Sequence, residues 1–267
     1  MRLLALFCLS LSAGPLAAHE FWLEPSQWQV APDARLEGRI VNGQSFAGIE
    51  LAYIPQRTAR YEIFNAGQQA AVEMRAGDRP GLSADPLGEG LNVVIYQTNP
   101  STVDYETWEK FQSFVDHKDL GVTEADQIAR GLPLAEFSEV YFRFSKTLIA
   151  VGDGAGADLR TGMETEIVAL TNPYTDDLTD GVRVQLFYQY DVRAEEQIEV
   201  FDRAPDGEVT ISYVRTDADG IATVPVVPGH DYMLDAVVLR EPAPDLAEAS
   251  GAVWETLWAN LTFAVPN

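Results

Sequence analysis

Apolar and polar residues alternate along most of the first half of the chain. The clearest example runs from Ala34 to Val41 and ends at the turn pair Asn42-Gly43, which is typical of a half-buried strand. Gly- and Pro-containing clusters separate such segments at about eight to twelve residue intervals, which favours an antiparallel sandwich. Before residue 152 we predict strands at 21–23, 34–41, 49–54, 60–65, 70–74, 91–97 and 136–151.

Helical spacing replaces this alternation after Asp104, the expected N-cap. From Trp108 onward, aromatic and aliphatic residues recur every three or four positions, as on one face of an amphipathic helix. Thr123 and Asp126 resemble a capping box that opens a second short helix. We therefore predict a helical insertion at about 104–131 inside a β domain.

The second half of the chain is again rich in predicted strands. This half follows a glycine-rich stretch at residues 152–160. No predicted helix follows that stretch and its glycines lack phosphate-loop spacing, so we interpret residues 152–160 as a flexible linker. Seven strands in such a length are typical of an immunoglobulin-like sandwich. They are predicted at 164–170, 182–190, 197–202, 209–216, 222–227, 233–239 and 257–265.

These patterns predict a mainly β protein with two β-sandwich domains. The N-terminal sandwich spans residues 19–151 and contains the helical insertion, and the immunoglobulin-like domain spans residues 161–267. A chain of 267 residues is long enough for two domains.

The first 18 residues have the pattern of a secretory signal. Arg2 precedes an apolar run from Leu3 to Leu11, and small residues lead to Ala18. This run is too short to cross a bilayer, and no later stretch is long and apolar enough, so we expect no membrane span in the mature chain. We predict a periplasmic or secreted protein.

Composition narrows the chemistry that an exported chain of this kind can use. The formal net charge is −23, which disfavours nucleic acid and anionic lipid and favours cations. The single cysteine, Cys8, lies inside the signal. The mature chain therefore has no disulfides, and any metal site must use nitrogen and oxygen ligands.

Cleavage after Ala18 would make His19 the first residue of the mature protein. Its amine and one ring nitrogen could then close a chelate ring on a metal ion, since both are neutral donors near pH 7, with ordinary pKa values of about 8 and about 6.5. Glu20 follows directly and could add an oxygen ligand. Such a donor set prefers Cu(II), then nickel or cobalt.

A second histidine would strengthen this site, and the mature chain offers His117 and His230. His117 falls away from the centre of the predicted apolar helix face, and His230 lies in a turn, so a solvated role is the alternative for each. Serine nucleophile motifs and dinucleotide fingerprints are absent from the sequence, so we do not expect an enzyme. The candidate metal ligands are His19, Glu20, His117 and His230.

Several short motifs, in their order and spacing, resemble the DUF4198 family, which includes a periplasmic component associated with nickel and cobalt uptake. They are His19 to Pro25, Gly43-x-x-Phe46-x-Gly48, Glu139-x-Tyr141-x-Arg143-x-x-Lys146, Asn172-Pro173-Tyr174, Thr216 to Gly220, Pro228-Gly229 and Trp254 to Ala259.

The resemblance implies a role in capturing a transition metal or delivering it to a membrane metal-uptake transporter, rather than catalysis. One departure from the resembled family concerns the strand after the Pro-Gly turn, where many relatives carry a histidine and this chain has Val238 and apolar neighbours. A site using that histidine would be lost or moved.

Two other hypotheses stay open, a non-metal module that binds another envelope protein and a copper oxygenase built on the terminal histidine.

Overall fold

The computed structural model describes residues 20–267 and has a mainly β fold of the sandwich type, as the sequence predicts. Its strands form one ten-stranded sheet and two four-stranded sheets. The predicted signal peptide lies outside the described residues, so export stays a prediction. Within residues 20–267, no helix combines the length and apolar character needed to cross a membrane.

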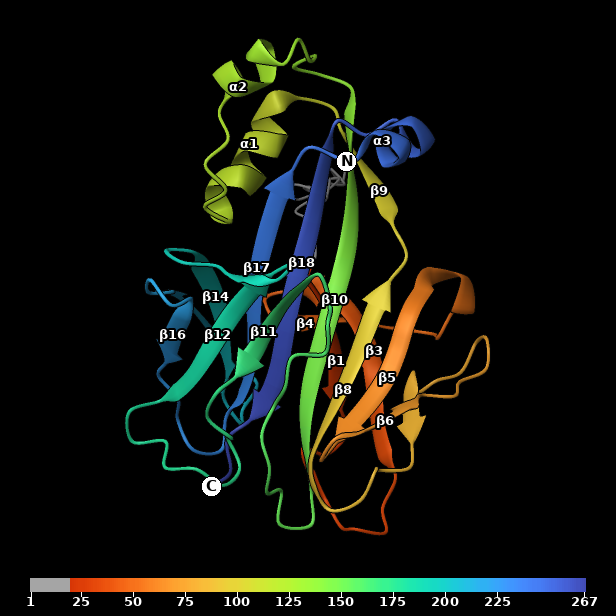
Figure 1. The fold of residues 1–267 in the computed structure, drawn as a ribbon, viewed down its shortest axis with the longest axis vertical. Helices are drawn as coiled ribbons and strands as arrows, with labels where there is room; N and C mark the ends of the chain where they lie inside the picture. Colours follow the sequence, from red (N-terminus) through yellow and green to blue (C-terminus); the bar gives the residue numbers. More distant parts are fainter. Residues whose placement is uncertain (1–19) are drawn as a thin grey trace, which may run out of the picture.

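The ten-stranded sheet runs through the whole molecule (Figure 1). From edge to edge, its main path is β15 (Val209–Arg215), β14 (Gln197–Arg203), β17 (Asp231–Arg240), β18 (Trp254–Ala264), β10 (Phe137–Val151), β8 (Gly90–Thr98), β5 (Thr58–Asn65) and β6 (Gln68–Ala71). Two short strands, β2 (Gln29–Val30) and β9 (Ser101–Tyr105), also pair with β10.

Strands from both predicted domains meet in the middle of this sheet. β10 and β18 pair in parallel, with Arg143 opposite Trp258. The predicted boundary at residues 152–160 stays a prediction, although the side chain of Asp158 in this segment is fully buried and lies 3.2 Å from Lys146 of β10. The two halves of the chain therefore share one sheet.

Two smaller sheets cover opposite faces of the large one. The first contains β1 (Glu20–Pro25), β3 (Leu36–Gln44), β4 (Ala47–Leu51) and β7 (Leu82–Ala84). The second contains β11 (Thr165–Ala169), β12 (Val182–Tyr188), β13 (Asp191–Val192) and β16 (Ile221–Val224).

Side chains of β10 contribute to two hydrophobic cores, one on each face of the large sheet. Ile149 and Val151 pack with Phe21 of the first small sheet. Phe144 and Leu148 belong to the core that includes the second small sheet. Because successive strand residues point to opposite faces, one strand supplies side chains to both layers.

The α-helices lie at one end of the molecule (Figure 1). They are α1 (Trp108–His117), α2 (Glu124–Ala129) and α3 (Pro244–Ser250), and a 3-10 turn, η1 (Pro55–Arg57), lies elsewhere in the chain. The predicted capping box between Thr123 and Asp126 is confirmed. The predicted N-cap at Asp104 is wrong. Asp104 belongs to β9, where it pairs with Ser138 of β10, and α1 starts only after Thr107.

Candidate functional site

A buried ion cluster lies where β1, the end of α1 and the ten-stranded sheet meet. Lys118, the residue after α1, donates from Nζ to Glu199 Oε2 at 2.5 Å and to Asp235 Oδ2 at 2.8 Å. Glu20 Oε1 lies 3.4 Å from the same nitrogen. The side chains of these four residues are at most 4% exposed. Three carboxylates thus surround one ammonium group away from solvent.

Strand register and helix packing bring these groups together. Glu199 and Asp235 are directly paired between β14 and β17, so their side chains lie on the same face. Glu20 begins β1, which crosses that face and is held there by a hydrogen bond from the Leu23 amide to Ser145 Oγ at 3.1 Å. The Lys118 ammonium lies 4.9 Å from the centre of the Trp258 ring, a favourable distance for a cation on an aromatic face.

Burial and mutual attraction act against each other on the pKa values of the cluster. Burial raises the pKa of Glu20 and of Asp235, and their attraction to Lys118 offsets this only in part. For Glu199, burial is outweighed by His117 and Lys118, so its pKa is lowered. Burial also disfavours the Lys118 ammonium, but the carboxylates together raise its pKa above the ordinary value. The ion pairs therefore hold Lys118 and Glu199 in their charged forms.

His117 connects this cluster to solvent. Its Nε2 lies 3.1 Å from Glu199 Oε1, and its side chain is 49% exposed. The interaction with the Glu199 carboxylate raises the pKa of His117. Two of the predicted site residues, Glu20 and His117, therefore contact the same buried cluster from different elements.

His230 lies apart from that cluster. Its Nδ1 is 2.6 Å from Asp202 Oδ1. Asp202 is three residues beyond Glu199 on β14, and such residues point to opposite faces of a sheet. His230 directly precedes β17 and is five residues from Asp235, about 16 Å at the usual rise of a strand. The structure does not bring His230 to Glu20 or His117.

His19, the fourth predicted residue, lies outside the described residues and is joined covalently to Glu20. Among residues 20–267, no group of three or more His, Cys, Asp or Glu side chains is arranged to hold a metal ion. The Lys118 ammonium contacts all three carboxylates of the cluster. It therefore occupies the position that a metal cation between these carboxylates would need.

Sequence reasoning missed three members of the cluster. Glu199 and Asp235 each interrupt an apolar strand pattern, and a charge within such a pattern indicates a buried ion that needs a partner. That signal could have identified both carboxylates. Lys118 has no comparable signal, because it follows a helix among polar neighbours.

Comparison with known proteins assigns the family. The model of a domain of unknown function, DUF4198, matches residues 16–240. The chain belongs to this family. No curated protein matches the chain. The family part of the resemblance seen in the sequence is therefore confirmed, and DUF4198 itself carries no stated activity.

One solved structure with some likeness is a tetra-tandem repeat in the extending region of a large adhesion protein. It is 12% identical, with a TM-score of 0.21, and the match covers 92% of this chain and 49% of that chain. The chain therefore spans about half the length of that structure, and so low a score supports no conclusion about function.

Proposed function

We propose that the protein is an exported accessory protein that captures a transition-metal ion at its mature N-terminus. The ion is nickel, cobalt or copper, and the receiving partner is a membrane metal-uptake transporter. Its ligands are the amine and imidazole of His19, a carboxylate oxygen of Glu20 and the imidazole of His117. The observation that carries the proposal is that Glu20 and His117 contact one buried cluster at the start of β1.

Glu20 offers an oxygen for this role. Its Oε1 faces Lys118, while its Oε2 is buried and has no hydrogen-bond partner among residues 20–267. A buried carboxylate oxygen without a partner is costly. His19 is the adjacent residue, with an α-carbon about 3.8 Å from that of Glu20, so an ion chelated by His19 has a nearby anionic ligand.

His117 offers a nitrogen in a suitable setting. Its Nε2 faces Glu199, which leaves Nδ1 as the donor. Metal-ligating histidines commonly hold a carboxylate with the other ring nitrogen, and this contact orients the ring. The half-exposed ring also leaves a path for an ion from solvent.

Lys118 limits where the ion can bind. Its ammonium contacts Glu20, Glu199 and Asp235 and repels a divalent cation from the centre of the cluster. The ion therefore lies at the edge of the cluster, beside Glu20 and His117. His230 is not part of the proposed site because it bonds Asp202 on the opposite face.

The test uses protein exported and processed in cells. Mass spectrometry first establishes whether the mature chain begins at His19. Calorimetry with Ni(II), Co(II) and Cu(II) then compares this protein with a variant that carries one extra alanine before His19. We expect the extension to abolish tight binding because it removes the amine from the chelate ring. Equal binding by both forms would contradict the proposal.

A further inference from the structure

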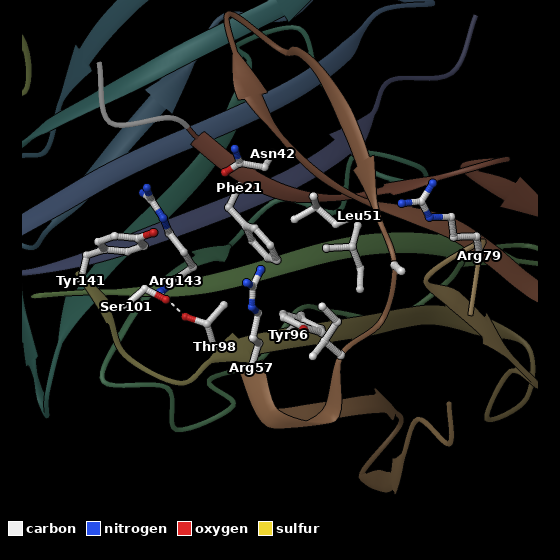
Figure 2. Close-up of a pocket in the computed structure, with 13 residues that line it drawn as sticks. Phe21, Asn42, Leu51, Arg57, Arg79, Tyr96, Thr98, Ser101, Tyr141 and Arg143 are labelled. Atoms are coloured by element: carbon white, nitrogen blue, oxygen red, sulfur yellow. Dashed lines mark hydrogen bonds between the residues drawn. The ribbon is translucent and has the colours of Figure 1, made fainter. Parts of the chain in front are cut away.

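A second candidate site is a pocket beside β1, on the same face of the large sheet as the ion cluster. Its volume is about 380 Å³, near the lower end of the roughly 300 to 1,000 Å³ typical of small-molecule sites. Phe21, Leu51 and Tyr96 contribute apolar surface to it (Figure 2). A pocket of this size accepts a small molecule rather than a protein segment.

The charge of the pocket is opposite to that of the protein. Arg57, Arg79 and Arg143 line it, and no lining residue in the described chain is acidic, although the protein has a formal net charge of −23. In Figure 2, Arg57 lies between Arg143 at one end and Arg79 at the other, with its guanidinium directed toward Phe21. The pocket is therefore suited to an anion.

Arg143 is the most informative of these residues. It is 6% exposed and forms no ion pair within 4 Å among residues 20–267, and its Nη1 has no hydrogen-bond partner there. Lys146, three residues further along β10, is fully buried but lies 3.2 Å from Asp158 and 3.4 Å from Glu166. Carboxylates act on Arg143 only from longer range, those of Asp235, Glu139 and Glu20. Since a buried charge normally requires a close partner, Arg143 differs from the directly paired cation on its own strand.

Aromatic rings hold the Arg143 guanidinium in place. It lies 4.0 Å from the Trp258 ring centre and 4.9 Å from that of Tyr141. The Arg143 amide also donates to Thr98 Oγ1 at 3.0 Å. The two rings orient the planar group, and its Nη1 is left without a hydrogen-bond partner among residues 20–267.

The sheet opens at this position because β10 changes partners. Its residues 148–151 pair with β8 and its residues 137–141 pair with β9. On the edge of β10 that faces β8 and β9, residues 142–147 pair with no strand in the described structure. Arg143 lies in this unpaired stretch. The pocket is thus built into the strand arrangement.

We propose that this pocket binds a small carboxylate with an apolar body. The carboxylate accepts hydrogen bonds from Arg143, whose planar fork matches the two carboxylate oxygens. The apolar body lies against Phe21, Leu51 and Tyr96. The proposal does not depend on metal capture, because Arg143 is not among the proposed metal ligands.

The test is calorimetry on metal-free protein from which all chelator has been removed. Three probes separate the contributions of charge and shape: 3-phenylpropionate, its amide 3-phenylpropionamide, and phenylphosphonate. We expect the carboxylate to bind about tenfold to a hundredfold more tightly than the amide, since hydrogen bonds to charged groups contribute about 1.5–3 kcal/mol. Absence of carboxylate binding, equal binding of the amide or preference for the phosphonate would each overturn the proposal.

Two pocket variants and a surface control complete the test. Arg143→Gln should weaken 3-phenylpropionate binding at least tenfold and leave the denaturation midpoint unchanged or higher, because it removes a buried charge that has no ion-pair partner within 4 Å among residues 20–267. Arg57→Gln, at an exposed position, should weaken binding without affecting folding. Arg35→Gln alters an exposed arginine paired with Asp85 and should bind normally. Unchanged binding by Arg143→Gln, or a lower midpoint without loss of binding, would show that Arg143 is structural.

Discussion

Glu199 and Asp235 lie directly opposite each other in the β14–β17 ladder, and both carboxylates contact the Lys118 ammonium. Like charges at paired positions repel, so this part of the sheet depends on a cation supplied from the end of α1. The cluster consequently ties the helical end of the molecule to the large sheet.

Replacing Lys118 by methionine should destabilise the protein by about 3–5 kcal/mol, the usual cost of leaving buried charges without a partner. Urea unfolding at pH 7 measures this loss. Lys110→Met is the matched control, because Lys110 is 40% exposed and pairs with Glu106 on the surface, where such pairs contribute about 0–1 kcal/mol. Equal losses in the two variants would contradict the assigned role of Lys118.

The contact between His117 and Glu199 should make stability depend on pH. The folded-state pKa of His117 is raised by Glu199. Its contribution to stability is therefore full below the unfolded pKa of about 6.5 and is lost as the pH rises through the raised folded pKa. Glu199 stays ionised in this window because its own pKa is lowered.

Unfolding free energies of wild type and His117→Gln across this pH range measure the effect. The difference should shrink as the pH rises, and an NMR titration should place the pKa of His117 above 6.5. A difference that is constant with pH would show that the contact does not contribute as an ion pair.

The segment at residues 152–160 should contribute to stability through Asp158. Lys146→Met would leave the fully buried Asp158 and Glu166 carboxylates without their shared cation and should cost about 3–5 kcal/mol. Asp153→Asn, at an exposed position of the same segment, should cost less than about 1 kcal/mol. Chemical denaturation of both variants checks this, and a neutral Lys146→Met would refute it.

Most of the fold could be predicted because its strands are locally encoded. Alternation along β3 and β10, turn residues between strands and the helical spacing after Trp108 all reflect the local backbone geometry. The start of α1 could not be placed in this way, because pairing with Ser138 extends β9 through Asp104. Long-range pairing overrides a local capping preference there.

The candidate site could be predicted only in part. Glu20 and His117 were identifiable as polar residues in suggestive positions, but their common neighbour Glu199 depends on strand register and on β1 crossing the sheet. Arg143 appears in the sequence only as part of a family motif, and its pocket arises from a change of strand partners that no local pattern encodes.

Metal binding should weaken as the pH falls, because the His19 amine and both imidazoles must be deprotonated to act as ligands. His117 should contribute only at a higher pH than an ordinary histidine, since its pKa is raised by Glu199. Calorimetry with Ni(II) between pH 6 and 9 measures this. Affinity that does not change over this range would exclude nitrogen ligands that titrate there.

The most direct test of the metal site compares Ni(II) affinity in His117→Ala and His230→Ala, both processed to begin at His19. His117 contacts the cluster that contains Glu20, whereas His230 bonds Asp202 on the other face of the sheet. We predict at least tenfold weaker binding for His117→Ala and unchanged binding for His230→Ala. Unchanged binding by His117→Ala, or a loss confined to His230→Ala, would contradict a site beside Glu20 and His117.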